Sequence, residues 1–261
     1  MSVIFAAVML VMPLLVVISQ ALGTGWDNCW KAITNLFTLK ALYLTLITTV
    51  SAVTANTVFG LAAAWALSRY SFRGQGLLVT MIDLPFAISP IIAGLIFILT
   101  YGRLGWMNPF LEAHQIKIVF ATPGIVMATI FVTIPFVARE LIPVLAARGT
   151  DEEQAAVLMG AGFLAIFFKV TLPHIKWALL YSVILCSARA MGEFGAVSVV
   201  SGHLRGKTNT LPLHIEILYN EHHYNEAFSV SAILVVTSIV ILTARSVVER
   251  VSKREERSGL L

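Results

Sequence analysis

Two charged residues, Arg189 and Glu193, stand in an otherwise apolar stretch from Trp177 to Leu204. They lie four residues apart, so on one helix they would share a face and could form an ion pair. If that helix starts near Lys176, Arg189 lies about 20 Å along it, close to the middle of a membrane, where an unpaired charge is costly. The simplest interpretation is an internal ion pair. If the pair faces the interior of a helix bundle, it also marks a translocation path.

Other residue patterns that could carry chemistry fail on spacing. A phosphate-binding loop could end at Gly206-Lys207-Thr208, but the glycine that must stand five positions earlier is replaced by Ser201. Neighbouring His222 and His223 point in different directions and lack metalloenzyme spacing, and the two cysteines, Cys29 and Cys186, lie too far apart in predicted depth to pair. We therefore expect no catalytic residue, metal site or cofactor on this chain.

Composition indicates a membrane protein. Of 261 residues, 58% are hydrophobic and 12% are charged, against about 25% charged in an ordinary soluble domain. The net charge of +4 is therefore interpreted by position along the chain rather than as a nucleic-acid surface.

The apolar runs predict an all-α integral membrane protein with six transmembrane helices. A run needs about 20 residues without Asp, Glu, Lys or Arg to cross the hydrocarbon. No basic residue precedes the first run, so we interpret it as a span rather than a secretory signal. Pro85 and Pro90 predict that the third span is bent or broken. The predicted spans are residues 1–22, 42–68, 78–101, 122–145, 175–200 and 227–247.

Lys and Arg are more abundant in the inner segments if both termini are cytoplasmic, which is the orientation that the positive-inside rule favours. The basic tail, with Lys253, Arg254 and Arg257, adds to this bias. Arg139 and Glu140 fall near the inner end of the fourth span, so we interpret them as interfacial.

The longest inner loop, residues 148–174, is predicted to be ordered. Thr150 and Glu153 have the spacing of a capping box, and three acidic residues follow Thr150 where a helix N-terminus favours negative charge. Gly160 and Gly162 are expected to interrupt this helix, and Pro173 to start the fifth span. Composition alone leaves open an interfacial amphipathic helix or a docking helix for another protein.

The spacing of this loop resembles the E-A-A-x3-G-x9-I-x-L-P signature of binding-protein-dependent ABC importer permeases. The positions that carry the resemblance are Gln154, Ala155, Ala156, Gly160, Val170, Leu172 and Pro173. Gln154 stands where the family usually has Glu, which removes a carboxylate that could pair with a basic partner residue; Glu152 or Glu153 could substitute. Val170 replaces Ile.

Further stretches look like the W-type permease subunit of sulfate/thiosulfate importers. They are 83–90, 91–95 and 188–202, within a similarity that spans most of residues 41–220. Molybdate permeases share the general layout and the Gly-Glu-Phe-Gly element, so a molybdate/tungstate permease is an alternative. An ion-coupled secondary transporter is a second alternative, but the sequence shows none of the internal symmetry that is common in that class.

The resemblance implies a type I ABC importer permease (MetI-like) fold, with one permease domain over 1–261 and a cytoplasmic coupling loop over 148–174. Gln154, Ala155, Ala156, Gly160, Leu172 and Pro173 would contact a dimer of separate ATPase subunits, which carry ATP and Mg. A second permease subunit, the T-type or another copy, would complete the pore. A periplasmic or extracellular sulfate-binding protein would meet the outer loop 203–226. The expected location is the bacterial cytoplasmic (inner) membrane.

Overall fold

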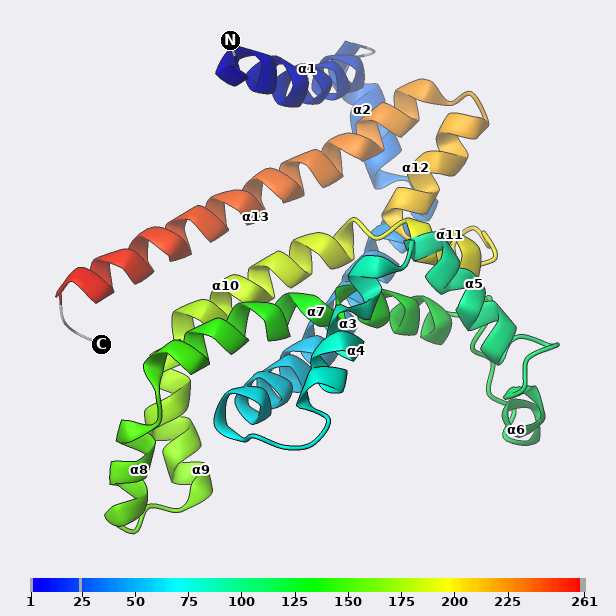
Figure 1. The fold of residues 1–261 in the computed structure, drawn as a ribbon. Coiled ribbons are helices and arrows are strands. Elements are labelled where there is room, and N and C mark those ends of the chain that lie inside the picture. The colour runs from blue at the N-terminus through cyan, green and yellow to red at the C-terminus, as the bar shows by residue number, and fades with distance from the viewer. Residues whose placement is uncertain (1, 24, 259–261) are drawn as a thin grey trace. The chain divides into compact units, whose positions relative to one another are not determined.

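The structure is a computed structural model that describes the backbone of residues 2–23 and 25–258. These residues form helices and no strands, which confirms the all-α prediction (Figure 1). Met1 and the side chains of Lys253, Arg254 and Arg257 lie outside the described residues. The helices are α1 (Ser2–Gly23), α2 (Trp26–Thr34), α3 (Leu36–Arg69), α4 (Gln75–Ala87), α5 (Pro90–Tyr101), α6 (Asn108–Ala113), α7 (Thr122–Arg148), α8 (Asp151–Leu158), α9 (Phe163–Ile166), α10 (Leu172–Met191), α11 (Gly195–Val200), α12 (Leu211–Asn220) and α13 (Tyr224–Ser258).

Four described helices are long and apolar enough to cross a membrane. They are α3, α7, the continuous helix Phe163–Met191 and the Tyr224–Ser252 part of α13, and α4 with α5 makes a fifth span if the two are counted together. The described part of α1 contributes a shorter apolar segment, Val11–Gly23. A multi-span protein is therefore confirmed, and the count of six stays a prediction.

The third span is broken where the prolines predicted it. Helix α4 ends at Ala87 and α5 begins at Pro90, with Ile88 in an extended conformation between them. Proline has no N–H to donate and excludes the residue before it from helical geometry, so the break falls just before Pro90.

The helix that contains most of the fifth predicted span starts earlier than expected. It runs without interruption from Phe163 through a π-helical turn, Phe167–Thr171, in which the Leu172 N–H donates to the Phe167 oxygen five residues back. Pro173 cannot donate a backbone hydrogen bond, and a widened turn just before it is one way for a helix to absorb that loss. The prediction that Pro173 starts the span was wrong.

The chain forms two compact units. One comprises the chain up to Thr49 with Pro90–Thr129 and Met191–Val240, and the other comprises Val50–Ser89 and Ile130–Ala190 with the chain from Ile241 onward. We describe them as unit 1 and unit 2. The single permease domain predicted over 1–261 stays a prediction.

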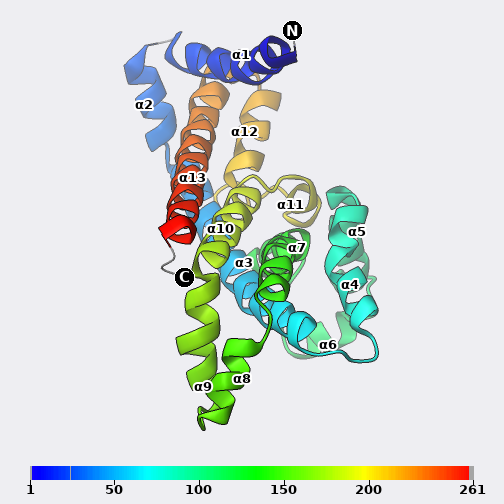
Figure 2. The ribbon, with the colours of Figure 1, turned by 60° about the vertical axis from the view of Figure 1, so that its left-hand side comes forward.

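Unit 1 is held by close helix contacts and buried polar pairs. Helix α11 lies beside α5 (Figure 2), and a Cβ added at Gly94 would come within 2.7 Å of the Ala196 oxygen. The Leu211 N–H donates to Thr45 Oγ1 over 2.7 Å. His214 lies 3.2 Å from Thr38 Oγ1, and burial lowers the pKa of His214, which keeps the imidazole neutral.

Unit 2 is built around the contact of α3 with α7. Asn56 is fully buried and donates to Thr133 Oγ1 over 2.7 Å. One turn further along α3, a Cβ added at Gly60 would lie 2.7 Å from Val137 Cβ, so only glycine permits this approach. The core beside it comprises Ala64, Val137, Leu141, Leu145, Ile175 and Cys186.

We predict that Gly60→Ala destabilises the protein and that Gly76→Ala does not. The added methyl at residue 60 must push α7 away, at about 1–3 kcal/mol. Gly76 lies on an open face of α4 with no atom within 4 Å of an added Cβ, so its substitution is neutral or slightly stabilising, by up to about 1 kcal/mol. Thermal unfolding of both variants in detergent checks this, and equal melting temperatures would contradict the close packing.

Candidate functional site

Helix α8 begins as predicted, but its predicted capping box is wrong. Thr150 is the residue before the helix and its side chain makes no capping bond. Its hydroxyl instead accepts a hydrogen bond of 2.8 Å from Gln154 Nε2. Glu153, which was expected to return to Thr150, is turned toward Arg69 at the end of α3 because a guanidinium is a stronger partner for a carboxylate than a backbone N–H.

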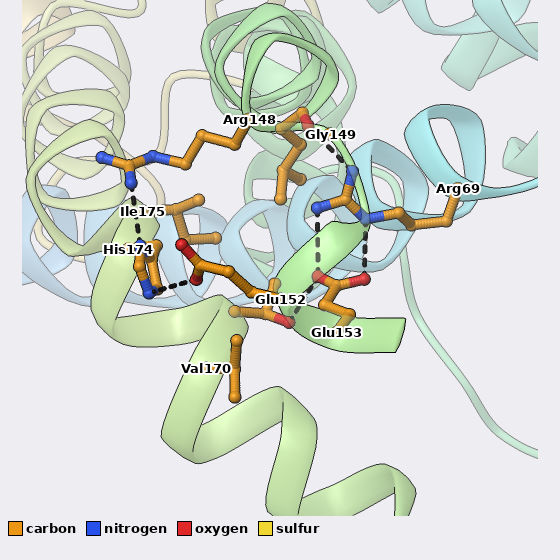
Figure 3. Close-up of a pocket in the computed structure, with 10 residues that line it drawn as sticks. Arg69, Arg148, Gly149, Glu152, Glu153, Val170, His174 and Ile175 are labelled. Carbon is orange, nitrogen blue, oxygen red and sulfur yellow. Dashed lines mark hydrogen bonds and ion pairs between the residues drawn. The ribbon is translucent and has the colours of Figure 1, made fainter. Parts of the chain in front are cut away.

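The pair of Arg69 and Glu153 joins four elements (Figure 3). Arg69 Nε lies 2.9 Å from Glu153 Oε2 as an ion pair, although its N–H is not aligned for a hydrogen bond. Arg69 Nη2 donates to Glu153 Oε1 over 3.0 Å, and Nη1 donates to the Leu145 oxygen over 2.9 Å. Thr171 donates to the same Oε1 over 2.8 Å. The side chains of Arg69 and Glu153 are only 8% and 16% exposed, so α8 is pinned to α3, α7 and the π-helical turn.

A second set of contacts lies beside this pair and is more open to water. Arg148 Nη1 donates to His174 Nδ1 over 2.8 Å, and His174 Nε2 lies 2.9 Å from Glu152 Oε2. Because Nδ1 accepts, the proton of the neutral ring is on Nε2, where it faces Glu152. The cavity between the two sets has a volume of about 60 Å³, enough for a few water molecules and too small for a cofactor. The two sets of contacts join α3, α7, α8 and the start of α10.

Gly160 ends α8 in a left-handed turn. Its φ is +83°, its N–H donates to the Val157 oxygen over 2.9 Å, and the Ala161 N–H donates to the Ala156 oxygen over 3.0 Å. This is the Schellman arrangement, which favours glycine at this position. No atom lies within 4 Å of an added Cβ, so the requirement for glycine here is conformational rather than steric.

The far end of α8 and the start of α9 present apolar side chains to the surface, and the two helices lie side by side in both views. Leu158 is 89% exposed and Met159 is 82% exposed. We call the following set the apolar tip: Val157, Leu158, Met159, Phe163 and Leu164, all of which are exposed. A groove of about 330 Å³, lined in part by Trp65, Tyr70 and Phe163, runs beside it.

The predicted coupling residues lie in two segments, around α8 and at the start of α10, and differ in exposure. Gln154, Ala155 and Gly160 are exposed on or beside α8, whereas Ala156 is buried. Leu172 packs on the core of unit 2, and Pro173 is exposed on the first turn of α10. Their contact with an ATPase stays a prediction.

Arg189 and Glu193 do not share a helix face. Helix α10 ends at Met191 and α11 begins at Gly195, so Glu193 lies in the break between them. Its Oε1 accepts the Ala196 N–H over 2.9 Å, and the residue is only 2% exposed. Glu193 thus satisfies a free N–H in the first turn of α11, and the predicted helical i, i+4 arrangement was wrong. The ion pair and its place on a translocation path stay predictions.

Sequence reasoning missed Arg69, Thr171 and His174 as parts of the site. Arg69 carried no expected role beyond the general excess of Lys and Arg in the inner segments. One signal was available, since an arginine that ends a long apolar helix is well placed to bond the carbonyls at a neighbouring helix end, as Arg69 does with Leu145.

Comparisons with known proteins agree with the all-α membrane fold. Residues 56–257 match the family model described as binding-protein-dependent transport system inner membrane component. The sulfate transport system permease protein CysW of Synechococcus elongatus is 46% identical over 98% of this chain and 90% of its own length. CysW of Escherichia coli K12 is 43% identical over 97% and 87%, and CysT of the same strain is 35% identical over 92% and 87%.

Among solved structures, a bacterial ABC transporter involved in alginate import matches with a TM-score of 0.77 at 14% identity, over 97% of this chain and 92% of that one. At this identity the match shows the fold alone. Together with the family match, it confirms the predicted ABC importer permease fold. The chain belongs to the family of binding-protein-dependent transport system inner membrane components, and within it to the group that contains these W-type permeases.

Proposed function

We propose that this chain is the W-type permease subunit of an ATP-driven sulfate importer, where it forms half of the pore and couples to a separate ATPase. The W-type relatives at 43–46% identity are named as sulfate permeases, which supports the cargo. The observation that carries the coupling role is the short helix α8, which a nearly buried ion pair holds while its apolar tip stays exposed.

The apolar tip favours a protein partner over solvent. Leu158 and Met159 lie almost fully in the open, and a cluster of large exposed apolar side chains marks an interaction surface. A short helix that presents such a cluster fits a groove on another protein. Because α8 is pinned to α3, α7 and the π-helical turn, a push or pull on the tip moves those helices.

Gln154 lacks the carboxylate that the family usually has, so another acidic residue would have to meet a basic residue of the ATPase. Glu153 is engaged with Arg69 and is only 16% exposed. The side chain of Glu152 is 68% exposed and its partner His174 is a weak one. Glu152 is therefore the residue that we assign to this contact.

The proposed assembly contains two permease subunits, an ATPase dimer that binds ATP and Mg, and a periplasmic or extracellular sulfate-binding protein. T-type relatives at 35–36% identity favour a T-type subunit as the second permease, and a second copy of this chain is the alternative. A solved neighbour is a complex with a periplasmic protein, and here the loop 203–226 would meet such a partner. The chain crosses the inner membrane several times, with both termini in the cytoplasm.

Two other functions make different predictions. A molybdate/tungstate permease would take up molybdate, and sulfate would compete only weakly for that uptake. An ion-coupled secondary transporter would work without ATP. Co-purification followed by mass spectrometry shows whether an ATPase and a second permease accompany the chain. Radiolabelled sulfate uptake with molybdate as competitor identifies the anion, and ATP-independent uptake by the chain alone would overturn the proposal.

We predict that Glu153→Gln uncouples the transporter. The neutral amide leaves the nearly buried Arg69 without its countercharge, at an expected cost of about 2 kcal/mol to the attachment of α8. Sulfate uptake should fall roughly tenfold or more while the ATPase keeps its basal rate. Asp151→Asn is the matched control, since Asp151 is exposed on the same helix and is expected to cost less than about 1 kcal/mol. Equal uptake by the two variants would refute a mechanical role for the pair.

We predict that Gly160→Val abolishes uptake while the protein remains inserted in the membrane. A β-branched residue is strained at the φ of +83°, so the turn after α8 must rearrange and the apolar tip loses its position. Gly162→Val is the control, because Gly162 has an ordinary φ of −76° and open space around it. Uptake is measured alongside an immunoblot of the membrane fraction, and normal uptake by Gly160→Val would exclude this role.

A further inference from the structure

An ion pair between two apolar helices of unit 2 plays no part in the coupling site. Arg139 of α7 forms a bidentate ion pair with Asp83 of α4: Nε lies 2.7 Å from Oδ1, and Nη2 donates to Oδ2 over 3.1 Å. The guanidinium also lies 5.1 Å from the centre of the Phe86 ring. Both charges are therefore held in a fixed, two-point geometry.

The pair lies well inside the two helices rather than at their ends. Helix α7 continues to Arg148, so Arg139 is about 14 Å from its C-terminal end at 1.5 Å per residue. Asp83 is about 12 Å from the N-terminal end of α4, which starts at Gln75. Where this part of the two helices lies within the hydrocarbon, both charges require a protein or water environment. The interfacial position expected for Arg139 stays a prediction.

Arg139 is also open on one side. Its side chain is 57% exposed although it binds Asp83, whose side chain is 31% exposed. Hydrocarbon rejects an exposed guanidinium, so this open side is expected to face water, headgroups or a polar protein surface. The break at Ile88 and Ser89 follows Asp83 by little more than one turn, and irregular backbone at membrane depth occurs where it lines a water-filled cavity or is buried in protein.

We propose that Arg139 is an anion-contacting residue of the translocation path and that Asp83 is its exchangeable counter-ion. The inference rests on the proposed function. The guanidinium fork that binds a carboxylate at two points also matches two oxygens of a tetrahedral oxyanion. Cargo sulfate displaces the Asp83 carboxylate from Arg139 as it passes, and the returning carboxylate releases it. Asp83 thus prevents a fixed positive charge from trapping a dianion.

The test compares two single variants that break the same pair. Chain variants are produced with the ATPase, the second permease and the binding protein in a host that lacks its own sulfate importer. Uptake of radiolabelled sulfate is measured in cells, and retention of labelled sulfate is measured on the purified transporter in phosphatidylcholine nanodiscs, where no anionic lipid competes. Arg73→Gln is the matched control, because Arg73 is an exposed loop arginine of the same unit.

The two variants are expected to change the retention of sulfate in opposite directions. Asp83→Asn leaves Arg139 charged and unneutralised, so retention of sulfate rises roughly tenfold while uptake slows. Arg139→Gln loses both retention and uptake by a similar factor, and Arg139→Lys, which keeps the charge without the fork, lies between. Membrane abundance and melting temperature are measured for each variant.

If the ion pair only holds α4 against α7, a different result is expected. Asp83→Asn and Arg139→Gln would then lower melting temperature and uptake to the same extent, with no gain of retention in Asp83→Asn, and this outcome overturns the inference. Normal uptake by Arg139→Gln also overturns it. In either case wild-type and Arg73→Gln transporters still import sulfate, so the proposed function stands; absence of uptake by the wild-type assembly overturns both.

Discussion

The ion pair of Arg69 and Glu153 is the interaction on which the coupling segment depends. Both side chains are nearly buried, and an isolated charge in such a place is costly, so each residue requires the other. Arg69 Nη1 also donates to the Leu145 oxygen, and Glu153 Oε1 also accepts from Thr171. The segment between two membrane helices is consequently part of the folded structure of unit 2. In the proposed function, a force on its exposed end is passed to the helices that hold its other end.

Polar side chains lie at or near the places where the long apolar helices are interrupted. A spanning helix must satisfy its own N–H and carbonyl groups, so an interruption is tolerated only where protein or water replaces the lost bonds. The break at Ile88 and Ser89 follows Asp83, the π-helical turn contains Thr171, and the break after Met191 contains Glu193, whose carboxylate accepts a backbone N–H of α11. At each of these places a polar side chain compensates for the interruption or stands within about one turn of it.

The sequence was informative where one local property decides the structure. Runs without charge located the long helices, Pro90 located the broken span, and Gly160 located the end of α8 through its need for positive φ. It failed where partners are distant in sequence. Glu153 was assigned to a neighbouring threonine because nothing local reveals a partner 84 residues away. Glu193 was placed on the helix of Arg189 because a single glycine, Gly192, does not by itself predict a helix end. The interpretation of residues 148–174 as a docking loop rests on a resemblance to known permeases, since composition leaves an interfacial helix and a docking helix open.

The most direct test of the coupling role asks what lies against Leu158, the most exposed residue of the apolar tip. The native cysteines of this chain are both buried, so Leu158→Cys provides a single exposed reactive position on this subunit. A membrane-impermeant maleimide and a cysteine-to-amine crosslinker are applied to inside-out vesicles and to intact cells. The account predicts a crosslink to the ATPase subunit in inside-out vesicles and no labelling of intact cells. Labelling of Leu158→Cys from outside intact cells would contradict it.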